Sequence, residues 1–324
     1  MLLEVDDLRV EFRLRDGVAH AVNGVSFQVE AGETLAVLGE SGCGKSVTAQ
    51  AVMGILDTPP GRIAGGRILF QGRDLLALKE EERRRLRGAG LAMIFQDALS
   101  ALNPVMTVGA QLAEMFTVHR GMSRKDARGR AVELMDRVRI PAAAQRVRDY
   151  PHQFSGGMRQ RVMIAMALAL EPALVIADEP TTALDVTVQA QVMDLLAELQ
   201  RSYAIGLILI THDLGVVADV ADRIAVMYAG RIVESAPVHA LYKSPAHPYT
   251  RGLLDSVPRL DRKGRELYAI KGLPPSLARI PSGCAFHPRC PLARDVCRTD
   301  RPPLYPVDER RGAACHFWRE CLDG

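Results

Sequence analysis

The sequence predicts an α/β fold with a mainly parallel sheet, and two kinds of segment that alternate along the chain carry this prediction. Leu174–Ala177, Leu207–Ile210 and Ile224–Met227 are short and continuously apolar, as buried parallel strands are. Between them, Val186–Gln200 and Leu214–Asp222 have the spacing of amphipathic helices. Because strands that alternate with helices run parallel, we expect βαβ units here.

The N-terminal part of the chain, up to about residue 75, predicts short strands instead. Segments rich in Val, Leu, Ile and Phe and separated by glycines cover Leu2–Phe12, Val25–Val29, Thr34–Leu38 and Arg67–Phe70. A single helix interrupts these strands and begins near Gly44.

From residue 78 to residue 161 the pattern becomes mainly helical. Ser123 can cap a helix, because Asp126 follows it at the spacing of a capping box. The charged run Lys79–Arg87 is typical of a solvated helix face. The apolar positions that recur on one face of the capped helix are Ala131, Leu134, Met135 and Val138.

After Glu234 the character of the sequence changes. Prolines cluster between Pro274 and Pro303, no strand pattern follows, and five of the six cysteines lie at or beyond residue 284. We expect a domain boundary near residue 235 and a C-terminal extension without strands.

Composition limits the classes of function. The chain has 324 residues, and 41 Lys and Arg against 38 Asp and Glu leave no long-range basic field, so we expect no nucleic-acid partner. The acidic N-terminus does not resemble a secretory signal, and the apolar run Val162–Leu170 is far shorter than the roughly 20 residues that span a bilayer. We therefore expect a cytosolic, reducing location, where the cysteines are poor candidates for disulfides.

A glycine-rich loop follows the predicted strand Thr34–Leu38 and opens the predicted helix. The loop consists of Gly39, Glu40, Ser41, Gly42, Cys43, Gly44, Lys45 and Ser46, which is a P-loop pattern. Its glycines let backbone amides turn towards phosphate oxygens, and the helix N-terminus adds its dipole. Lys45 is expected to neutralise the β- and γ-phosphates, and Ser46 to hold Mg²⁺.

Two carboxylates follow the apolar strand Leu174–Ala177. In open α/β sheets, ligands bind beyond the carboxyl ends of the strands. Asp178 is therefore expected to stand behind the Mg²⁺ shell, and Glu179 to orient or deprotonate an attacking water.

Further motifs complete a resemblance to the ATP-binding cassette (ABC) ATPases. A Gln follows the strand Leu91–Phe95, a Ser-Gly-Gly signature opens a helix within Phe154–Arg161, and Ile210–Asp213 carries a switch histidine. With the P-loop, the acidic strand end and the D-loop Ala183–Asp185, the order matches that family. The resemblance implies a P-loop NTPase (RecA-like) core with an antiparallel β subdomain and a helical subdomain inserted at about 97–165. It also implies a cassette domain over 1–235 and a small Cys-rich C-terminal domain over 236–324.

The resemblance also implies roles for residues outside the P-loop. In such ATPases two cassettes meet head to tail, and each ATP lies between one P-loop and the opposite signature. Ser155, Gly156 and Gly157 would then contact the γ-phosphate held by a partner, and Asp185 would bridge the interface. Gln96 would sense Mg²⁺ and water, and His212 would hold the water and Glu179 in line.

Two departures from the family pattern stand out. Met158 occupies the position where many cassettes have Gln. The aromatic residue that usually stacks on adenine is absent from the stretch near Asp16, and Phe12 and His20 are the alternatives. The base contact stays unassigned.

Three segments narrow the resemblance to the ATP-binding subunits of oligopeptide and dipeptide importers: Ala101–Pro104, His247–Leu254 and Gly283–Pro291. The resemblance implies a second, paralogous ATP-binding subunit, two membrane permeases and an extracytoplasmic substrate-binding protein. The chain would lie on the cytoplasmic face of the membrane. Import of nickel or another small solute is an alternative, and so is a soluble cassette ATPase of translation or DNA repair.

The C-terminal cysteines suggest a metal, because a segment of about 40 residues cannot bury enough apolar surface to fold alone. Four thiolates suit zinc or an iron–sulfur cluster, and His287 and His316 keep zinc open. Some members of the resembled family carry a 4Fe-4S cluster here, which implies one on Cys284, Cys290, Cys297 and Cys315. No metal at all is the third alternative.

Overall fold

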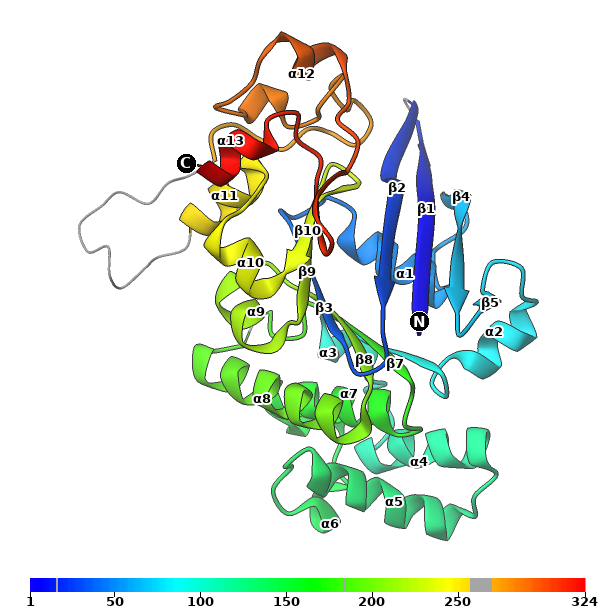
Figure 1. The fold of residues 1–324 in the computed structure, drawn as a ribbon. Helices are drawn as coiled ribbons and strands as arrows, with labels where there is room; N and C mark the ends of the chain where they lie inside the picture. The colour runs from blue at the N-terminus through cyan, green and yellow to red at the C-terminus, as the bar shows by residue number, and fades with distance from the viewer. Residues whose placement is uncertain (16, 183, 257–269, 324) are drawn as a thin grey trace. The chain divides into compact units, whose positions relative to one another are not determined.

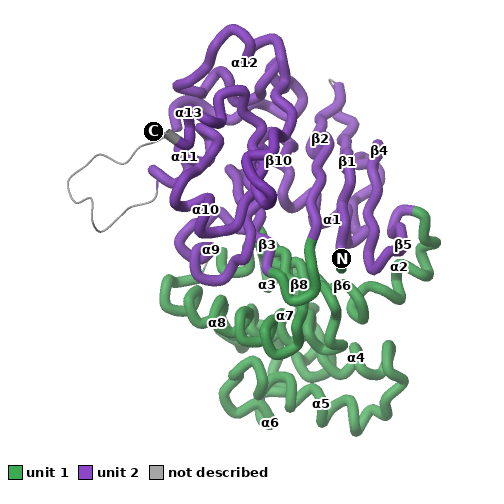
Figure 2. Tube along the Cα trace, viewed as in Figure 1, with its two compact units in different colours: residues 1–2, 29–33, 77–210 green, residues 3–28, 34–76, 211–324 purple. Residues whose placement is uncertain are grey.

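The computed structural model describes residues 1–15, 17–182, 184–256 and 270–323 (Figure 1). Ala183 of the expected D-loop lies outside these residues. The chain divides into two compact units, which Figure 2 distinguishes by colour. Unit 1 comprises residues 1–2, 29–33 and 77–210, and unit 2 comprises residues 3–28, 34–76 and 211–324.

Unit 1 contains three parallel strands, β6 (Leu91–Ile94), β7 (Leu174–Asp178) and β8 (Gly206–Ile210). Leu91 pairs with Leu174, and Leu174 pairs with Gly206. All residues of the three strands are buried, which explains their continuous apolar sequences. The parallel βαβ prediction is confirmed for this unit.

Helices make up most of the rest of unit 1. Ser123 caps α5 and accepts a hydrogen bond from the Asp126 amide, and the four apolar positions predicted for its inner face are buried. α2 has no buried residue, as predicted for a solvated face. The helices are α2 (Glu80–Leu86), α3 (Ala98–Ala101), α4 (Val108–Arg120), α5 (Arg124–Arg137), α6 (Ala143–Arg146), η1 (Pro151–Gln153), α7 (Gly156–Leu168) and α8 (Val186–Tyr203).

Unit 2 contains an antiparallel sheet with the strand order β2-β1-β4-β5. Its strands are β1 (Leu3–Leu14), β2 (Gly17–Val29), β4 (Gly61–Phe70) and β5 (Arg73–Asp74). β2 and β4 begin earlier than predicted, at Gly17 and Gly61. Their additional residues are mostly exposed or half-buried, so no continuous apolar run marks them in the sequence.

A second group of strands in unit 2 extends into the C-terminal part. β3 (Thr34–Leu38) pairs in parallel with β9 (Arg223–Tyr228), which pairs antiparallel with β10 (Arg231–Pro237). β12 (Arg311–Ala313) then pairs with β10, and β11 (Tyr305–Asp308) with β12. The expectation of a C-terminal extension without strands is therefore wrong. Two short strands return there because β10 offers an edge whose backbone groups need partners.

The helices of unit 2 are α1 (Lys45–Met53), α9 (Leu214–Val220), α10 (Val238–Lys243), α11 (Pro248–Asp255), η2 (His287–Arg289), α12 (Asp295–Thr299) and α13 (Trp318–Asp323). In the described part of the chain, none of the helices combines the length and apolar character needed to cross a membrane.

The C-terminal residues of unit 2 share a hydrophobic core with the strands that carry the P-loop. Leu38 of β3, Tyr228 of β9, Tyr249 of α11 and Phe286 belong to one buried cluster, against which Cys290 packs. A separate Cys-rich domain is not confirmed, since this part of the chain contributes to the core of unit 2.

Candidate functional site

The P-loop connects β3 to α1 and requires glycine at two close approaches. Gly39 and Gly44 have φ values of +156° and +107°. A Cβ on Gly39 would lie 2.3 Å from the Met227 carbonyl oxygen, and one on Gly44 would lie 2.2 Å from the Ala21 carbonyl oxygen. A side chain at either position would therefore displace the backbone of the loop.

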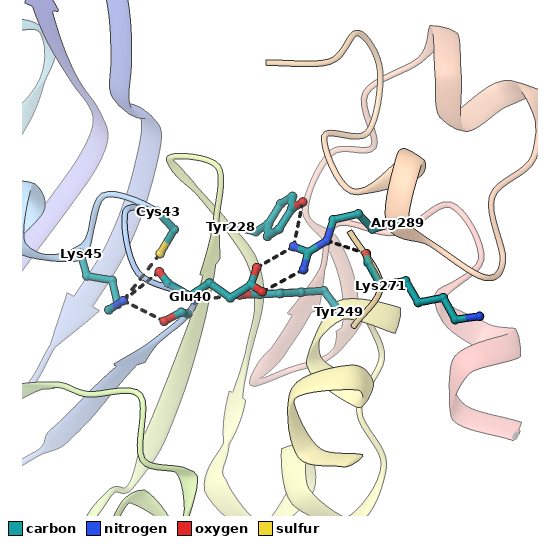
Figure 3. A network of polar contacts seen from close by, with 8 residues as sticks. Glu40, Cys43, Lys45, Tyr228, Tyr249, Lys271 and Arg289 are labelled. Atoms are coloured by element: carbon teal, nitrogen blue, oxygen red, sulfur yellow. Dashed lines mark hydrogen bonds and ion pairs between the residues drawn. The ribbon is translucent and has the colours of Figure 1, made fainter. Parts of the chain in front are cut away.

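Lys45 is buried, and its ammonium group is held by the loop itself (Figure 3). Its Nζ donates to the carbonyl oxygens of Gly39 (2.8 Å) and Glu40 (3.1 Å). Burial raises the pKa of the adjacent Cys43 thiol. Cys43 is therefore a small buried residue, and the loop holds the Lys45 ammonium group against its own carbonyl oxygens.

The two predicted carboxylates lie at the end of β7 in unit 1. Asp178 is the last residue of the strand and is 5% exposed. Glu179 follows with a φ of +46°, a conformation that non-glycine residues rarely adopt. The Glu179 amide donates to the Ile210 carbonyl (2.8 Å), so β8 holds the residue in this strained backbone geometry.

The Glu179 carboxylate accepts two hydrogen bonds through Oε2. Gln96 Nε2 donates from 3.1 Å, and the Thr182 hydroxyl donates from 3.0 Å. The structure thus brings together Gln96 and Glu179, which are far apart in the sequence. Thr182 is a residue that the sequence reasoning missed, and its hydroxyl three positions after Glu179 is the only signal that could have found it.

The signature and the D-loop aspartate are both helix N-terminal residues. Ser155 caps α7, and its hydroxyl accepts a hydrogen bond from the Met158 amide. Asp185 caps α8 and accepts from the Val188 amide (3.0 Å). A Cβ on Gly157 would lie 2.4 Å from Val188 Cγ1, so glycine lets the first turns of α7 and α8 approach each other.

The switch histidine and the candidates for the base contact lie in unit 2. His212 is exposed and precedes Asp213, whose carboxylate caps α9. Phe12 is half-buried, and His20 is exposed with Nδ1 3.3 Å from Glu11 Oε1. None of these contacts distinguishes Phe12 from His20 as the residue that stacks on adenine.

Four of the five cysteines of the C-terminal extension, Cys284, Cys290, Cys297 and Cys315, line a common small pocket. The other lining residues are His247, Phe286, His287, Leu292, Pro302, His316 and Phe317. Burial raises the pKa of Cys284 to about 11 and that of Cys290 to about 12, so both are thiols at neutral pH. Cys321, for which the sequence indicates no role, is also buried and forms a hydrogen bond with the Cys315 thiol.

The expected metal centre is not supported by these positions. Within the described ranges, no group of three or more His, Cys, Asp or Glu side chains is arranged to hold a metal ion. The described residues therefore provide no preformed ligand set for an iron–sulfur cluster or for zinc. The four cysteines line one pocket, but in the described part of the chain they do not form a group that could hold a metal ion.

Two family models match the chain. The model described as ABC transporter matches residues 22–182, and the model described as Oligopeptide/dipeptide transporter, C-terminal region, matches residues 233–297. The first match contains the P-loop and both β7 carboxylates. The second contains Cys284, Cys290 and Cys297.

Solved structures with the same fold are ABC cassettes. A cassette solved as a dimer in a post-hydrolysis state with ADP and Pi aligns with a TM-score of 0.66 at 25% identity, over 73% of this chain and 98% of that chain. The protein cbiO1 of Clostridium perfringens, part of an ABC transporter complex, aligns with a TM-score of 0.63 at 29% identity, over 74% and 90%. The chain therefore has the ABC ATPase cassette fold.

Curated relatives cover nearly the whole chain. The oligopeptide transport ATP-binding protein OppD of Salmonella typhimurium is 54% identical over 97% of this chain and 93% of its own length. The dipeptide transport ATP-binding protein DppD of Bacillus subtilis is 54% identical over 94% of this chain and 90% of its own length. A chain with this P-loop, these β7 carboxylates and these relatives belongs to the ABC transporter ATPases, in the family of oligopeptide and dipeptide transport ATP-binding proteins.

Proposed function

We propose that this chain is the ATP-binding and ATP-hydrolysing subunit that energises import of oligopeptides or dipeptides across the cytoplasmic membrane. The observation that carries the proposal is the Glu179 carboxylate, held by Gln96 and Thr182 directly after a buried parallel strand. A carboxylate fixed in this way can orient a water molecule for attack on a phosphoryl group. The peptide is proposed as the transported solute because the relatives are oligopeptide and dipeptide transport ATP-binding proteins.

In this proposal the P-loop binds the phosphates of ATP. Residues Gly39 to Ser46 direct their backbone amides towards phosphate oxygens, and α1 adds the positive end of its dipole. Lys45 would exchange its two carbonyl partners for phosphate oxygens, which carry more negative charge. Ser46 and Gln96 are the proposed Mg²⁺ ligands, and Asp178 would stand behind the Mg²⁺ shell. The bound ion would neutralise phosphate charge.

Glu179 is the proposed base that orients or deprotonates water. Gln96 fixes one carboxylate oxygen through its amide and would also contact the water, and His212 would hold the water in line with the γ-phosphate. The strained backbone at Glu179 supports this role, because such strain persists where the surrounding structure enforces it and is concentrated at active sites.

The remaining proposed roles require partners. We propose that Ser155, Gly156 and Gly157 contact the γ-phosphate of ATP on a paralogous ATP-binding subunit, and that Asp185 bridges the two cassettes. The solved relative that is a dimer with ADP and Pi supports this arrangement by analogy. Two membrane permeases and an extracytoplasmic binding protein would complete the importer, with this chain on the cytoplasmic face.

Replacement of Glu179 by Gln tests the hydrolytic role. Gln keeps the size of the side chain and the capacity to accept a hydrogen bond, but it is not basic. We expect ATP turnover by Glu179→Gln to fall at least about 100-fold, while equilibrium binding of ATP stays within about threefold of wild type. Normal turnover in this variant would contradict the proposed mechanism. The exposed Glu198→Gln is the matched control, because it removes a carboxylate elsewhere in unit 1.

We also propose that Cys284, Cys290, Cys297 and Cys315 bind an iron–sulfur cluster. Two facts support the proposal: all four line one pocket, and thiolate is the ligand such clusters use. Binding would require the side chains to reorient and the raised-pKa thiols to lose their protons.

Metal analysis of anaerobically purified protein tests the cysteine proposal. We expect iron and acid-labile sulfide in equal amounts, lost in Cys290→Ser and retained in Cys321→Ser. Colourless protein with stoichiometric zinc, or with no metal, would refute the cluster.

A further inference from the structure

An arginine from the C-terminal extension makes a bidentate ion pair with a P-loop residue. Arg289 Nη1 lies 2.6 Å from Glu40 Oε2, and Arg289 Nη2 lies 2.9 Å from Glu40 Oε1 (Figure 3). Glu40 is the second residue of the P-loop, and its carbonyl oxygen is one of the two acceptors of Lys45. The ion pair therefore joins residue 289 to the loop that we propose receives the phosphates.

The surroundings of Arg289 fix its side chain in place. The side chain is 5% exposed, whereas that of Glu40 is 26% exposed. Arg289 Nε donates to the Lys271 carbonyl (3.1 Å), and Nη1 also lies 3.4 Å from the Tyr228 hydroxyl. Its guanidinium lies about 6 Å from the centre of the Phe286 ring. A guanidinium with this many partners is a rigid support for the Glu40 carboxylate.

The extension also contacts the backbone of the P-loop. The Glu40 amide donates to the Tyr249 hydroxyl oxygen at 2.9 Å. Tyr249 is fully buried, and its ring lies 4.6 Å from that of Tyr228 and 5.4 Å from that of Phe286, centre to centre. The backbone and the side chain of Glu40 are thus both held by residues of the C-terminal extension, Tyr249 and Arg289.

The charge of Glu40 matters for the ligand. A nucleoside triphosphate is strongly anionic, and an unpaired carboxylate in the loop that binds it would repel it. The guanidinium of Arg289 donates to both oxygens of that carboxylate, which neutralises its charge and fixes its orientation. Removal of Arg289 alone would leave the Glu40 carboxylate without its ion-pair partner. This single change is more unfavourable in free energy than replacement of both residues of the pair.

We propose that Arg289 is a positioning residue for nucleoside triphosphate binding, which it promotes by neutralising and orienting Glu40 of the P-loop. This inference rests on the proposed binding of ATP by that loop. It assigns to the C-terminal extension a part in nucleotide affinity. The alternative is that the ion pair only anchors the extension, and the two predict different behaviour in a double-mutant cycle.

The cycle compares Arg289→Met, Glu40→Gln and the double variant in the full-length chain, with a fluorescent ATP derivative as the probe. We expect Arg289→Met to weaken ATP binding by about tenfold or more, because Glu40 then repels the phosphates. Glu40→Gln in the Arg289→Met background is expected to restore binding to within about threefold of wild type. The loss of affinity in Arg289→Met should be smaller at high salt and smaller for the corresponding ADP derivative. Both changes weaken the repulsion between the Glu40 carboxylate and the phosphates.

Two further variants keep the outcome decidable. Arg294→Met removes another arginine–glutamate pair of the same extension, to Glu320 at 2.5 Å, and is expected to bind ATP as wild type does. If Arg289→Met fails to fold, Arg289→Lys replaces it, because Lys retains the positive charge but cannot make the bidentate hydrogen bond. We expect Arg289→Lys to bind ATP more weakly than wild type, and the combination with Glu40→Gln to restore ATP binding.

The inference is overturned if Arg289→Met binds ATP as tightly as wild type, or if the double variant binds as weakly as Arg289→Met. In either case, if the wild-type chain binds the ATP derivative, the proposed ATP site still stands and only the role of Arg289 is rejected. If the wild-type chain itself does not bind the probe, the proposed function fails instead.

Discussion

At the scale of single residues, His247 is a buried neutral group that links folding to pH. It is 1% exposed, and its Nδ1 accepts a hydrogen bond from the Tyr249 amide at 3.0 Å. Burial lowers its pKa from 6.5 to about 3. The folded chain therefore keeps the neutral imidazole, while the unfolded chain takes up a proton below about pH 6.5. Its contribution to stability is present above pH 6.5 and is lost as the pH falls towards 3.

The variant His247→Asn separates this effect, because the Asn side-chain oxygen can still accept the Tyr249 amide hydrogen bond. Between pH 7.5 and 5.5 we expect the wild-type free energy of unfolding to fall by about 1.4 kcal/mol more than that of His247→Asn. Urea unfolding at the two pH values measures this difference. His239→Asn, at an exposed position of α10, is the control. Equal pH dependence in wild type and His247→Asn would refute the assignment.

The positions of candidate site residues could be predicted where one local motif contains the chemistry. The strand–glycine loop–helix pattern around Lys45 and the carboxylates after β7 are of this kind. Contacts made across the fold could not be predicted in the same way. The pairing of Gln96 with Glu179 needed a family resemblance, and Arg289 with Glu40 joins positions 249 residues apart.

At the scale of elements, the predictability of a strand depended on how it is buried. β7 and β8 are buried throughout, so their sequences are unbroken apolar runs. β4 has exposed and half-buried residues between buried ones, and only its last part carries a clear apolar signal. The early start of β4 was therefore missed.

The short C-terminal strands show a different limit. β12 has three residues, and Ala313 pairs with Glu234 of β10 at a large separation in sequence. Three residues contain no usable periodicity, so the pairing depends on the exposed edge of β10 and not on a local pattern. The clustered prolines led to the expectation that no strand would follow Glu234, and these two short strands contradict it.

At the scale of the whole molecule, the C-terminal extension is more than an addition to a complete ATPase. Tyr249 and Phe286 lie in the same buried cluster as Leu38 of β3, the strand that leads into the P-loop. The domain boundary near residue 235 stays a prediction. The shared core shows that residues on both sides of it contribute to one compact unit.

The central claim is that ATP hydrolysis by this chain powers peptide import, and uptake of a radiolabelled tripeptide tests it most directly. The measurement uses cells that express the proposed partners, which are two permeases, a binding protein and a paralogous ATP-binding subunit. This chain is either wild type or Glu179→Gln. We predict uptake with the wild-type chain and background uptake with Glu179→Gln, although both copurify with the permeases. Sustained uptake with Glu179→Gln, or ATP hydrolysis by the wild-type complex without uptake of any tested peptide, would contradict the claim.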